Sequence, residues 1–360
     1  MHDINEMQRA HGLRAGPPAS FSHVYGIRNY TVSPMGAPEG TVRLIISLAP
    51  MEGLTGHVFR RVHAECFGKF DRYYTPFLAH PHVGQPFSKK AFKEIDPEVN
   101  RGLNVIPQLL TNNAEQFVWA AQLLAELGYE QVSLNLGCPS GTVVSKGRGS
   151  GFLGKLDQLE AFLLEICEKS PLPVSVKTRL GLESDAEYER VLEVFCHCPL
   201  AELIVHPRVQ KDRYEGKPRQ EAYGATLARA PFPVAYNGDI FGVGDLEALI
   251  EAYPGTQHVM LGRGVLTNPA LAREAAGGPA LMQTELQQFH NKLFDAYEEE
   301  IGGNAVFRMK EWWFYAERAF ADPLAVHRAI RKVRKADEYR KVAARVFAEQ
   351  RLTANPCFER

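Results

Sequence analysis

Short apolar, β-branched runs alternate with longer helical patterns through most of this chain, and this alternation limits the folds open to it. Eight such runs lie at residues 42–50, 70–77, 103–110, 131–137, 172–180, 201–208, 232–239 and 257–264. Between them, stretches such as 113–128 and 156–170 carry apolar residues at helical spacing. The runs are apolar nearly throughout, which is typical of parallel strands buried on both faces.

Eight strand–helix units of this size predict an α/β fold, a (β/α)8 TIM barrel. A doubly wound open sheet is the alternative, but it usually carries a glycine fingerprint after its first strand, and LAPMEGLTG (48–56) is not that fingerprint. After about residue 281 the strand pattern stops and three helical stretches follow, the last of them at 327–349. We therefore expect three parts: an N-terminal extension (1–41), a catalytic barrel (42–280) and a small all-helical domain (281–360).

Charge is distributed unevenly along the chain. The net charge of −1 argues against a protein that binds nucleic acid indiscriminately. Residues 304–351, however, contain 12 Lys and Arg against 6 Asp and Glu, a local charge of +6, so the remainder carries −7. Within this region the run 327–335 has five cations and no acid. A solvated helix face would explain such a run, and a phosphate-binding surface is the alternative.

The cellular setting is indicated by what the sequence lacks. No apolar run approaches the roughly 18 residues of a membrane span, and the first 40 residues contain no apolar core of a secretory signal. Six irregularly spaced cysteines do not resemble a disulfide framework. We therefore expect a cytoplasmic protein with free thiols and no membrane contact. Cys196-His197-Cys198 resembles a metal-binding fragment, but no second ligand pair has zinc-like spacing, so we expect no metal.

Polar side chains end nearly every expected strand, where the active site of such a barrel lies. They are Glu52, Gln108, Asn135, Cys138, Lys177, Arg179, His206, Arg208, Asn237, Asp239 and Arg263. Because buried polar groups without partners are costly, we expect a ligand among them. The glycines of NGD (237–239) and GRG (262–264) follow the last two strands, where such barrels often bind phosphate. A planar cofactor with a phosphate fits this pattern, and FMN is the simplest choice.

Cys138 lies on a Gly-Cys-Pro turn after the fourth apolar run rather than inside it. A thiol with the ordinary pKa of about 8.5 is mostly protonated at pH 7, so it can donate a proton to carbon as a general acid. Two alternatives stay open: a nucleophilic thiol with His206 as its base, and an inert buried thiol.

Several motifs together resemble the tRNA-dihydrouridine synthases. They are LAPMEGLTG, PQLL, LNLGCPSGTV, VKTRLG, NGDI and MLGRG, spread over residues 42–265, and FRMKEWW (307–313), which is similar to an Arg-x-Lys-x-Trp element of one bacterial branch. The resemblance implies a barrel that binds FMN, is reduced by NADPH and converts specific uridines in tRNA to 5,6-dihydrouridine. It also implies RNA binding by the helical domain, and we expect a monomer.

The resemblance further implies roles for individual residues. The catalytic set would be Cys138, Asn135, Lys177 and His206. Within it Cys138 would give a proton to uracil carbon 5, Asn135 would position the base, and His206 would lie beside the flavin or substrate. The cofactor set would be Pro50, Met51 and Glu52 against the isoalloxazine, Gln108 and Lys177 on its rim, His206 beside it, and Asn237, Gly238, Asp239, Gly262 and Arg263 at the phosphate end. The RNA-binding set would be Arg308, Lys310, Arg328, Arg331, Lys332, Arg334 and Lys335.

The chain departs from the family pattern in three places. HPRVQKDRYEG (206–216) replaces the common His-Gly-Arg, the loop SKGRGSGFL (145–153) is bulkier than usual, and the extension 1–41 is unusual. These departures leave the RNA target open, so ribosomal RNA is an alternative substrate. A free-pyrimidine enzyme of the dihydroorotate or dihydropyrimidine dehydrogenase type is a second alternative, which would not need the basic C-terminal region. A non-catalytic RNA-binding protein is a third, although Cys138, Asn135 and Lys177 are all present.

Overall fold

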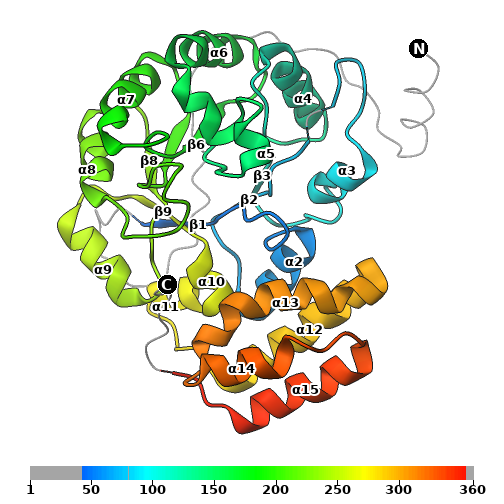
Figure 1. Ribbon diagram of the computed structural model, residues 1–360. Helices are drawn as coiled ribbons and strands as arrows, with labels where there is room; N and C mark the ends of the chain where they lie inside the picture. The colour runs from blue at the N-terminus through cyan, green and yellow to red at the C-terminus, as the bar shows by residue number, and fades with distance from the viewer. Residues whose placement is uncertain (1–42, 80, 354–360) are drawn as a thin grey trace. The chain divides into compact units, whose positions relative to one another are not determined.

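The computed structural model describes residues 43–79 and 81–353 (Figure 1), so the expected extension 1–41 lies outside the described residues. Nine short strands form one parallel sheet in the order β3-β2-β1-β9-β8-β7-β6-β5-β4. They are β1 (Ile45–Leu48), β2 (Arg72–Tyr74), β3 (Val105–Ile106), β4 (Gln108–Leu109), β5 (Val132–Leu136), β6 (Val174–Thr178), β7 (Glu202–Val205), β8 (Val234–Tyr236) and β9 (His258–Leu261).

The sheet has nine strands instead of the expected eight because the run 103–110 is interrupted at Pro107. Proline has no N–H to give to a neighbouring strand. β3 pairs with β2, β4 pairs with β5, and a bridge from Leu78 to Leu109 links β4 back to the β2 side. β3 and β4 therefore act as one strand that closes the sheet, and the predicted (β/α)8 barrel is confirmed.

Helices cover the outer face of the sheet and connect its strands (Figure 1). They are α2 (His57–Phe67), α3 (Lys89–Ile95), α4 (Ala114–Glu126), α5 (Gly141–Val144), α6 (Leu156–Lys169), α7 (Tyr188–His197), α8 (Gln220–Arg229), α9 (Val243–Ala252), α10 (Arg263–Thr267) and α11 (Leu271–Ala275). The expected helices at 113–128 and 156–170 are α4 and α6. Asn113 caps α4 by accepting a hydrogen bond from the Gln116 N–H at 2.9 Å, and Gly128 ends that segment at a φ of 87°.

The interior of the barrel is filled in layers. An apolar layer consists of Ala49, Tyr74, Ile106, Ile204, Ala235 and Met260. Towards the amino ends of the strands, the layer is polar: the Tyr74 hydroxyl donates to Glu202 at 2.7 Å, and His258 lies 2.5 Å from both Glu202 and Ser47. The packed apolar layer and the bonded polar layer leave the opposite end of the barrel, at the carboxyl ends of the strands, for a ligand.

Four helices follow the barrel, and Figure 1 shows them together on one side of it: α12 (Gln283–Ile301), α13 (Ala305–Ala316), α14 (Pro323–Ile330) and α15 (Ala336–Glu349). The expected single helix at 327–349 is wrong, because the chain breaks at 331–335 and α15 turns back against α14. Arg328 lies in the last turn of α14, and Asp337 in the first turn of α15. Each charge is at the helix end that it stabilises.

Helices α12 and α13 join this helical region to the barrel. α12 packs against α2, and α13 packs against α10. Trp312 and Trp313 are almost fully buried, as expected of helix-core residues rather than of a surface for stacking bases. The apolar core runs without interruption from the barrel into these helices, and the domain boundary at residue 281 stays a prediction.

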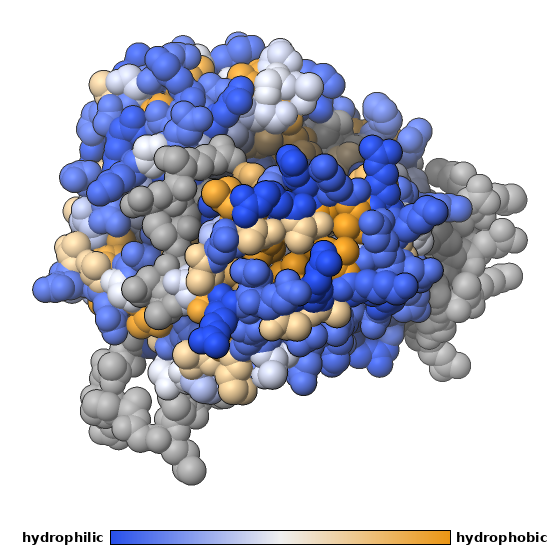
Figure 2. Space-filling view, turned by 60° about the horizontal axis from the view of Figure 1, so that its bottom comes forward, coloured by the Kyte–Doolittle hydropathy of each residue, from blue (hydrophilic) through white to orange (hydrophobic). Residues whose placement is uncertain are grey.

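The face seen in Figure 2 is mostly hydrophilic, with a strip of apolar side chains across its middle. Within the described residues, no helix combines the length and the apolar character that a membrane crossing needs.

Candidate active site

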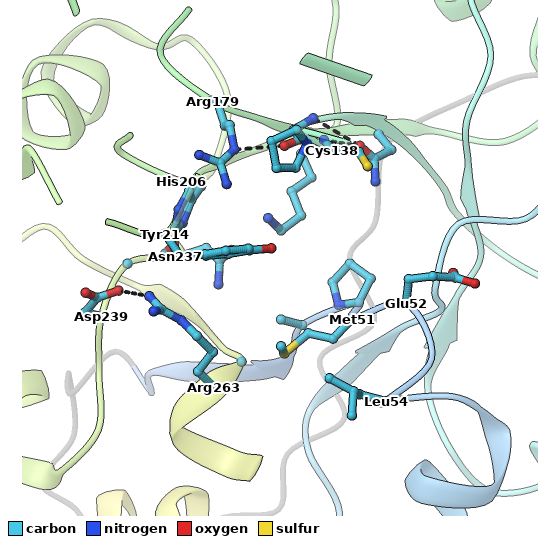
Figure 3. Close-up of a pocket in the computed structure, with 18 of the residues that line it drawn as sticks. Met51, Glu52, Leu54, Cys138, Arg179, His206, Tyr214, Asn237, Asp239 and Arg263 are labelled. Carbon is cyan, nitrogen blue, oxygen red and sulfur yellow. Dashed lines mark hydrogen bonds and ion pairs between the residues drawn. The ribbon is translucent and has the colours of Figure 1, made fainter. Parts of the chain in front are cut away.

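One pocket opens at the carboxyl ends of the strands (Figure 3). All of the residues predicted for catalysis or cofactor binding line it, namely Pro50, Met51, Glu52, Gln108, Asn135, Cys138, Lys177, His206, Asn237, Gly238, Asp239, Gly262 and Arg263. Gln108 of β4 and the segments at the ends of β1, β2, β5, β6, β7, β8 and β9 all contribute, because the carboxyl ends of parallel strands meet at one end of the barrel. Tyr315 of α13 also lines the pocket, so the helical region forms part of its wall.

Asn135, at the end of β5, shapes the turn that carries Cys138. Its Oδ1 accepts hydrogen bonds from the N–H groups of Gly137 at 3.0 Å and Cys138 at 2.9 Å. Its Nδ2 donates to Gln108 Oε1 at 2.8 Å. The amide of Asn135 therefore fixes the thiol-bearing turn, and the base-positioning role that the family resemblance implies for it stays a prediction.

A second segment holds Cys138 from behind. The N–H and hydroxyl of Ser150 both donate to the Cys138 carbonyl oxygen, at 3.2 and 2.9 Å. Gly149 has a φ of 55°, and a Cβ there would lie 2.9 Å from the same carbonyl oxygen. Only glycine tolerates both the backbone conformation and this approach. The turn at Cys138 and the loop at 149–150 therefore form one unit.

The thiol of Cys138 is partly buried at the edge of the pocket, near Arg179 (Figure 3). Burial raises its pKa, although the Ser140 backbone, Arg179 and Lys177 act in the opposite direction. A raised pKa keeps the thiol protonated at neutral pH. A thiol that stays protonated at neutral pH can donate a proton as a general acid.

Two cations line the pocket: Lys177 in β6 and Arg179 immediately after it. Burial, and then the charge of Arg179, lower the pKa of Lys177 to about 7. The guanidinium of Arg179 donates to the carbonyl oxygens of Gly137 and Val209 at 2.9 Å, and burial lowers its pKa to about 10. The pair can thus offer one permanent positive charge and one amine that gains or loses a proton near neutral pH.

Two polar atoms in the pocket have no hydrogen-bond partner among the described residues. His206 Nδ1 lies 2.6 Å from the Asn237 carbonyl oxygen, and burial with Arg179 and Lys177 lowers its pKa well below the usual value. The ring is therefore neutral, with its proton on Nδ1, and its buried Nε2 is an unused acceptor. The buried Nε2 of Gln108 is an unused donor. A ligand edge that carries both an N–H and a carbonyl would satisfy both atoms.

A charged corner lies at the ends of β7, β8 and β9. Asp239 accepts hydrogen bonds from Arg208 at 2.9 and 2.6 Å and a third from Arg263. One carboxylate thus holds two guanidinium groups, and the corner keeps a net positive charge. Gly264, the second residue of α10, lies at this corner, where a Cβ would lie 2.1 Å from the Ile240 carbonyl oxygen. The corner is suited to an anion.

Tyr214 is one of the pocket residues that sequence reasoning missed, as are Phe77, Phe241 and Tyr315. Its ring lies under Arg179 at 5.4 Å and Arg263 at 5.1 Å, and its edge faces His206. Arg179 and Arg208 were recognised as strand-end residues but were given no role. Tyr214 is eight residues beyond His206 in an irregular loop, so no periodic pattern signals it. The one available sign was its place in segment 206–216, which differs from the family pattern.

The predicted RNA-binding residues divide into two groups. Arg328, Arg331, Lys332, Arg334 and Lys335 are exposed, and none of them forms an ion pair with another described residue. Arg308 instead bonds to the Gly53 carbonyl oxygen and to Glu311, and Lys310 donates to the Arg331 carbonyl oxygen at 3.0 Å. The RNA contacts of all seven residues stay a prediction.

Across residues 43–79 and 81–353, no group of three or more His, Cys, Asp or Glu residues could hold a metal ion.

The fold and the pocket define a (β/α)8-barrel enzyme with its site at the carboxyl ends of the strands. The tRNA-dihydrouridine(16) synthase of Neisseria meningitidis serogroup B (strain MC58) is 29% identical over 329 residues, 85% of this chain and 95% of that protein. The probable tRNA-dihydrouridine synthase of Staphylococcus aureus (strain COL) is 31% identical over 265 residues, 70% of this chain and 78% of that protein. The structure of morphinone reductase in complex with tetrahydroNAD covers 66% of this chain and 88% of its own at 13% identity, with a TM-score of 0.46, a likeness too weak to bear on function. Residues 47–353 match the model of the family described as dihydrouridine synthase (Dus). The chain belongs to the dihydrouridine synthase family.

Proposed function

We propose that this protein reduces uridines in tRNA to 5,6-dihydrouridine, with FMN as its cofactor, NADPH as the reductant and Cys138 as the proton donor. The observation that carries the proposal is the meeting of a partly buried thiol, two cations and two unpartnered polar atoms in one pocket of a member of the dihydrouridine synthase family. The names of the neisserial and staphylococcal relatives support tRNA as the substrate.

The pocket residues fit FMN by their chemistry. The unused donor of Gln108 and the unused acceptor of His206 suit the carbonyl and N–H edge of an isoalloxazine ring. Lys177 would add a cation to that edge, and Pro50 and Met51 would lie against the ring. The net positive corner at Asp239 and Arg263 would take the phosphate, with Asn237, Gly238 and Gly262 beside it.

FMN, when bound, supplies the hydride that adds to uracil carbon 6. The chain's own residues then handle the charge and the proton. Negative charge on the uracil carbonyl groups would be stabilised by Arg179 and by Lys177, whose protonated form is favoured beside a developing anion. Cys138 would give its thiol proton to carbon 5, a step that Asn135 and Ser150 assist by fixing the turn that carries it.

The substrate base must leave its stack to enter the pocket. The exposed cations of 328–335 would hold phosphates of the surrounding RNA without reading its sequence.

The first test incubates the purified protein with NADPH and unmodified tRNA and measures dihydrouridine by nucleoside mass spectrometry, with mapping that includes position 16. Absence of dihydrouridine in tRNA, with NADPH oxidation intact, would overturn the proposal, and ribosomal RNA and free pyrimidines would then be tested.

Replacement of the thiol tests the role of Cys138 directly. We expect Cys138→Ala to keep its flavin absorption but to lose at least 100-fold in dihydrouridine formation, since general acid catalysis contributes about 10²–10⁴-fold. Cys167→Ala, which removes a partly buried thiol from α6, is the matched control and should retain full activity. Full activity in Cys138→Ala would show that another group donates the proton.

A further inference from the structure

Three cations gather in the loop between β5 and α6, the loop whose Cys138 end lines the pocket. Asn112 organises them: its Nδ2 donates to the carbonyl oxygens of Lys146 and Gly147 at 3.2 Å each, and Arg148 Nε donates to its Oδ1 at 3.4 Å. A Cβ on Gly147 would lie 3.6 Å from Lys155 Nζ, so that ammonium group lies over the same turn. We call Lys146, Arg148 and Lys155 the rim cluster.

The charges of the rim cluster are not neutralised by the protein. Within residues 43–79 and 81–353, none of the three forms an ion pair, and the bond from Arg148 to Asn112 is the one hydrogen bond that their side chains donate. Lys146 and Lys155 are exposed, and Arg148 is partly exposed. Holding like charges together without a carboxylate costs free energy, and an anionic partner would recover it.

The rim cluster lies across the pocket from the helical region. Its loop follows β5, whereas α13 packs on α10, which follows β9, and Arg308 of α13 contacts Gly53 after β1. With β3 and β4 counted as one strand, β5 is four strands from β9 in either direction round the closed sheet. The cluster and the helical region, which reaches the pocket through Tyr315 of α13, therefore lie on different sides of the pocket.

We propose that the rim cluster is a second phosphate-binding surface for the substrate RNA, opposite the one on the helical region. This inference rests on the proposed function. A strand whose base enters the pocket has phosphates on both sides of that base, so it would contact both surfaces. The cluster ends where α6 begins, because that helix presents Asp157, Glu160 and Glu168, which repel phosphate. The RNA strand would therefore cross the mouth rather than follow the outer helices.

The position of the cluster also connects RNA binding to the thiol. Arg148 precedes Gly149, which packs on the Cys138 carbonyl oxygen, and Ser150 bonds to that same oxygen. A phosphate held by Arg148 would steady the backbone that supports Cys138. The rim cluster is thus a positioning surface rather than part of the reacting groups.

The test is removal of the three charges in the full-length, flavin-loaded protein. The variant Lys146→Gln/Arg148→Gln/Lys155→Gln should bind an unmodified tRNA transcript about tenfold more weakly at 0.15 M salt, and the slope of log affinity against log salt should fall by about 2. The double variant Lys146→Gln/Lys155→Gln leaves the Arg148–Asn112 hydrogen bond intact, and it replaces the triple variant in the same measurements if the triple variant does not fold. The matched control Arg61→Gln/Lys69→Gln/Arg101→Gln removes three exposed cations from α2 and from the loops before β2 and β3, and it should bind as the wild type does.

The possible outcomes separate this inference from the proposed function. If the wild type forms no dihydrouridine in tRNA, the proposed function fails. If the wild type is active but the triple variant keeps its affinity and salt slope, the rim-cluster inference alone is overturned. A change in the KM for NADPH with tRNA binding unaltered would also overturn it, because the cluster would then bind the dinucleotide instead.

Discussion

Lys177 faces the pocket beside Arg179, with no carboxylate among the groups that set its charge. Burial and the neighbouring guanidinium lower its pKa from 10.5 to about 7. The unfolded chain therefore binds more protons than the folded chain between about pH 7 and 10. Stability consequently rises with pH across this window, and the penalty for burying Lys177 is constant below it.

The variant Lys177→Met keeps the shape of the side chain and removes the charge. In protein stripped of bound cofactor, we expect it to be more stable than the wild type at pH 7 by about 1–4 kcal/mol. The difference should shrink as pH rises from 7 towards 10. Urea unfolding of both proteins at several pH values measures this, and a difference that does not change with pH would contradict the assigned pKa.

Three catalytic-looking residues also meet at the amino end of the barrel, but they belong to a packed element. Ser47, His258 and Glu202 are connected in series at 2.5 Å, in the order of a serine hydrolase triad. All three are buried, and Arg72 and Tyr74 complete the bonding of the carboxylate. Residues at the amino end of such a barrel contribute to its stability, whereas the reaction occurs at the carboxyl end.

Glu202→Gln tests this element. Burial raises the pKa of Glu202, but His258, Arg72 and Tyr74 outweigh burial and bring it to about 2. The stabilisation is therefore complete above about pH 5 and is lost as pH falls from there through about 2. We expect Glu202→Gln to lower the free energy of unfolding at pH 7 by about 3–5 kcal/mol, measured by urea denaturation. Glu165→Gln, which breaks a surface pair with Lys169, should change little, and an equal loss in both variants would refute the assignment.

The strands and their order of appearance could be predicted from the sequence because buried parallel strands leave long apolar runs. Breaks inside these runs could not be predicted as readily. Pro107 divides one strand, yet both halves stay in the barrel because they pair with different neighbours. At the break at 331–335 the chain turns so that α15 packs against α14, a contact between neighbouring helices that helical spacing alone does not record.

The predicted cofactor and catalytic residues lie together for a topological reason: each ends a parallel strand. Residues on irregular loops were harder to predict. Tyr214 and Arg148 reach the pocket or its rim through turns held by tertiary hydrogen bonds, such as that between Asn112 and the loop backbone. Composition and periodicity contain no signal for such turns.

At the scale of the whole molecule, the barrel and the helical region share one core. Phe289 of α12 is fully buried, with its ring 5.7 Å from Phe59 and 5.4 Å from Phe67 of α2 and 6.0 Å from Trp312. We expect Phe289→Ala to cost about 3–5 kcal/mol and to leave a single unfolding transition. Tryptophan fluorescence, which mostly reports the helical region, and far-ultraviolet circular dichroism should give the same midpoint. Separate midpoints would mean that the two parts unfold independently, and Phe307→Ala, at an exposed site, is the control.

The uneven charge along the chain becomes uneven charge in space. Residues 304–351 carry +6 and the rest of the chain −7, and the acids of α6 and α7 lie on the outer side of the barrel. A molecule with this separation has a large electric dipole moment even though its net charge is only −1. In the field of a polyanion it would rotate before contact, so that its positive helical region faces the RNA at encounter. Added salt should therefore slow association more than its near-zero net charge would suggest.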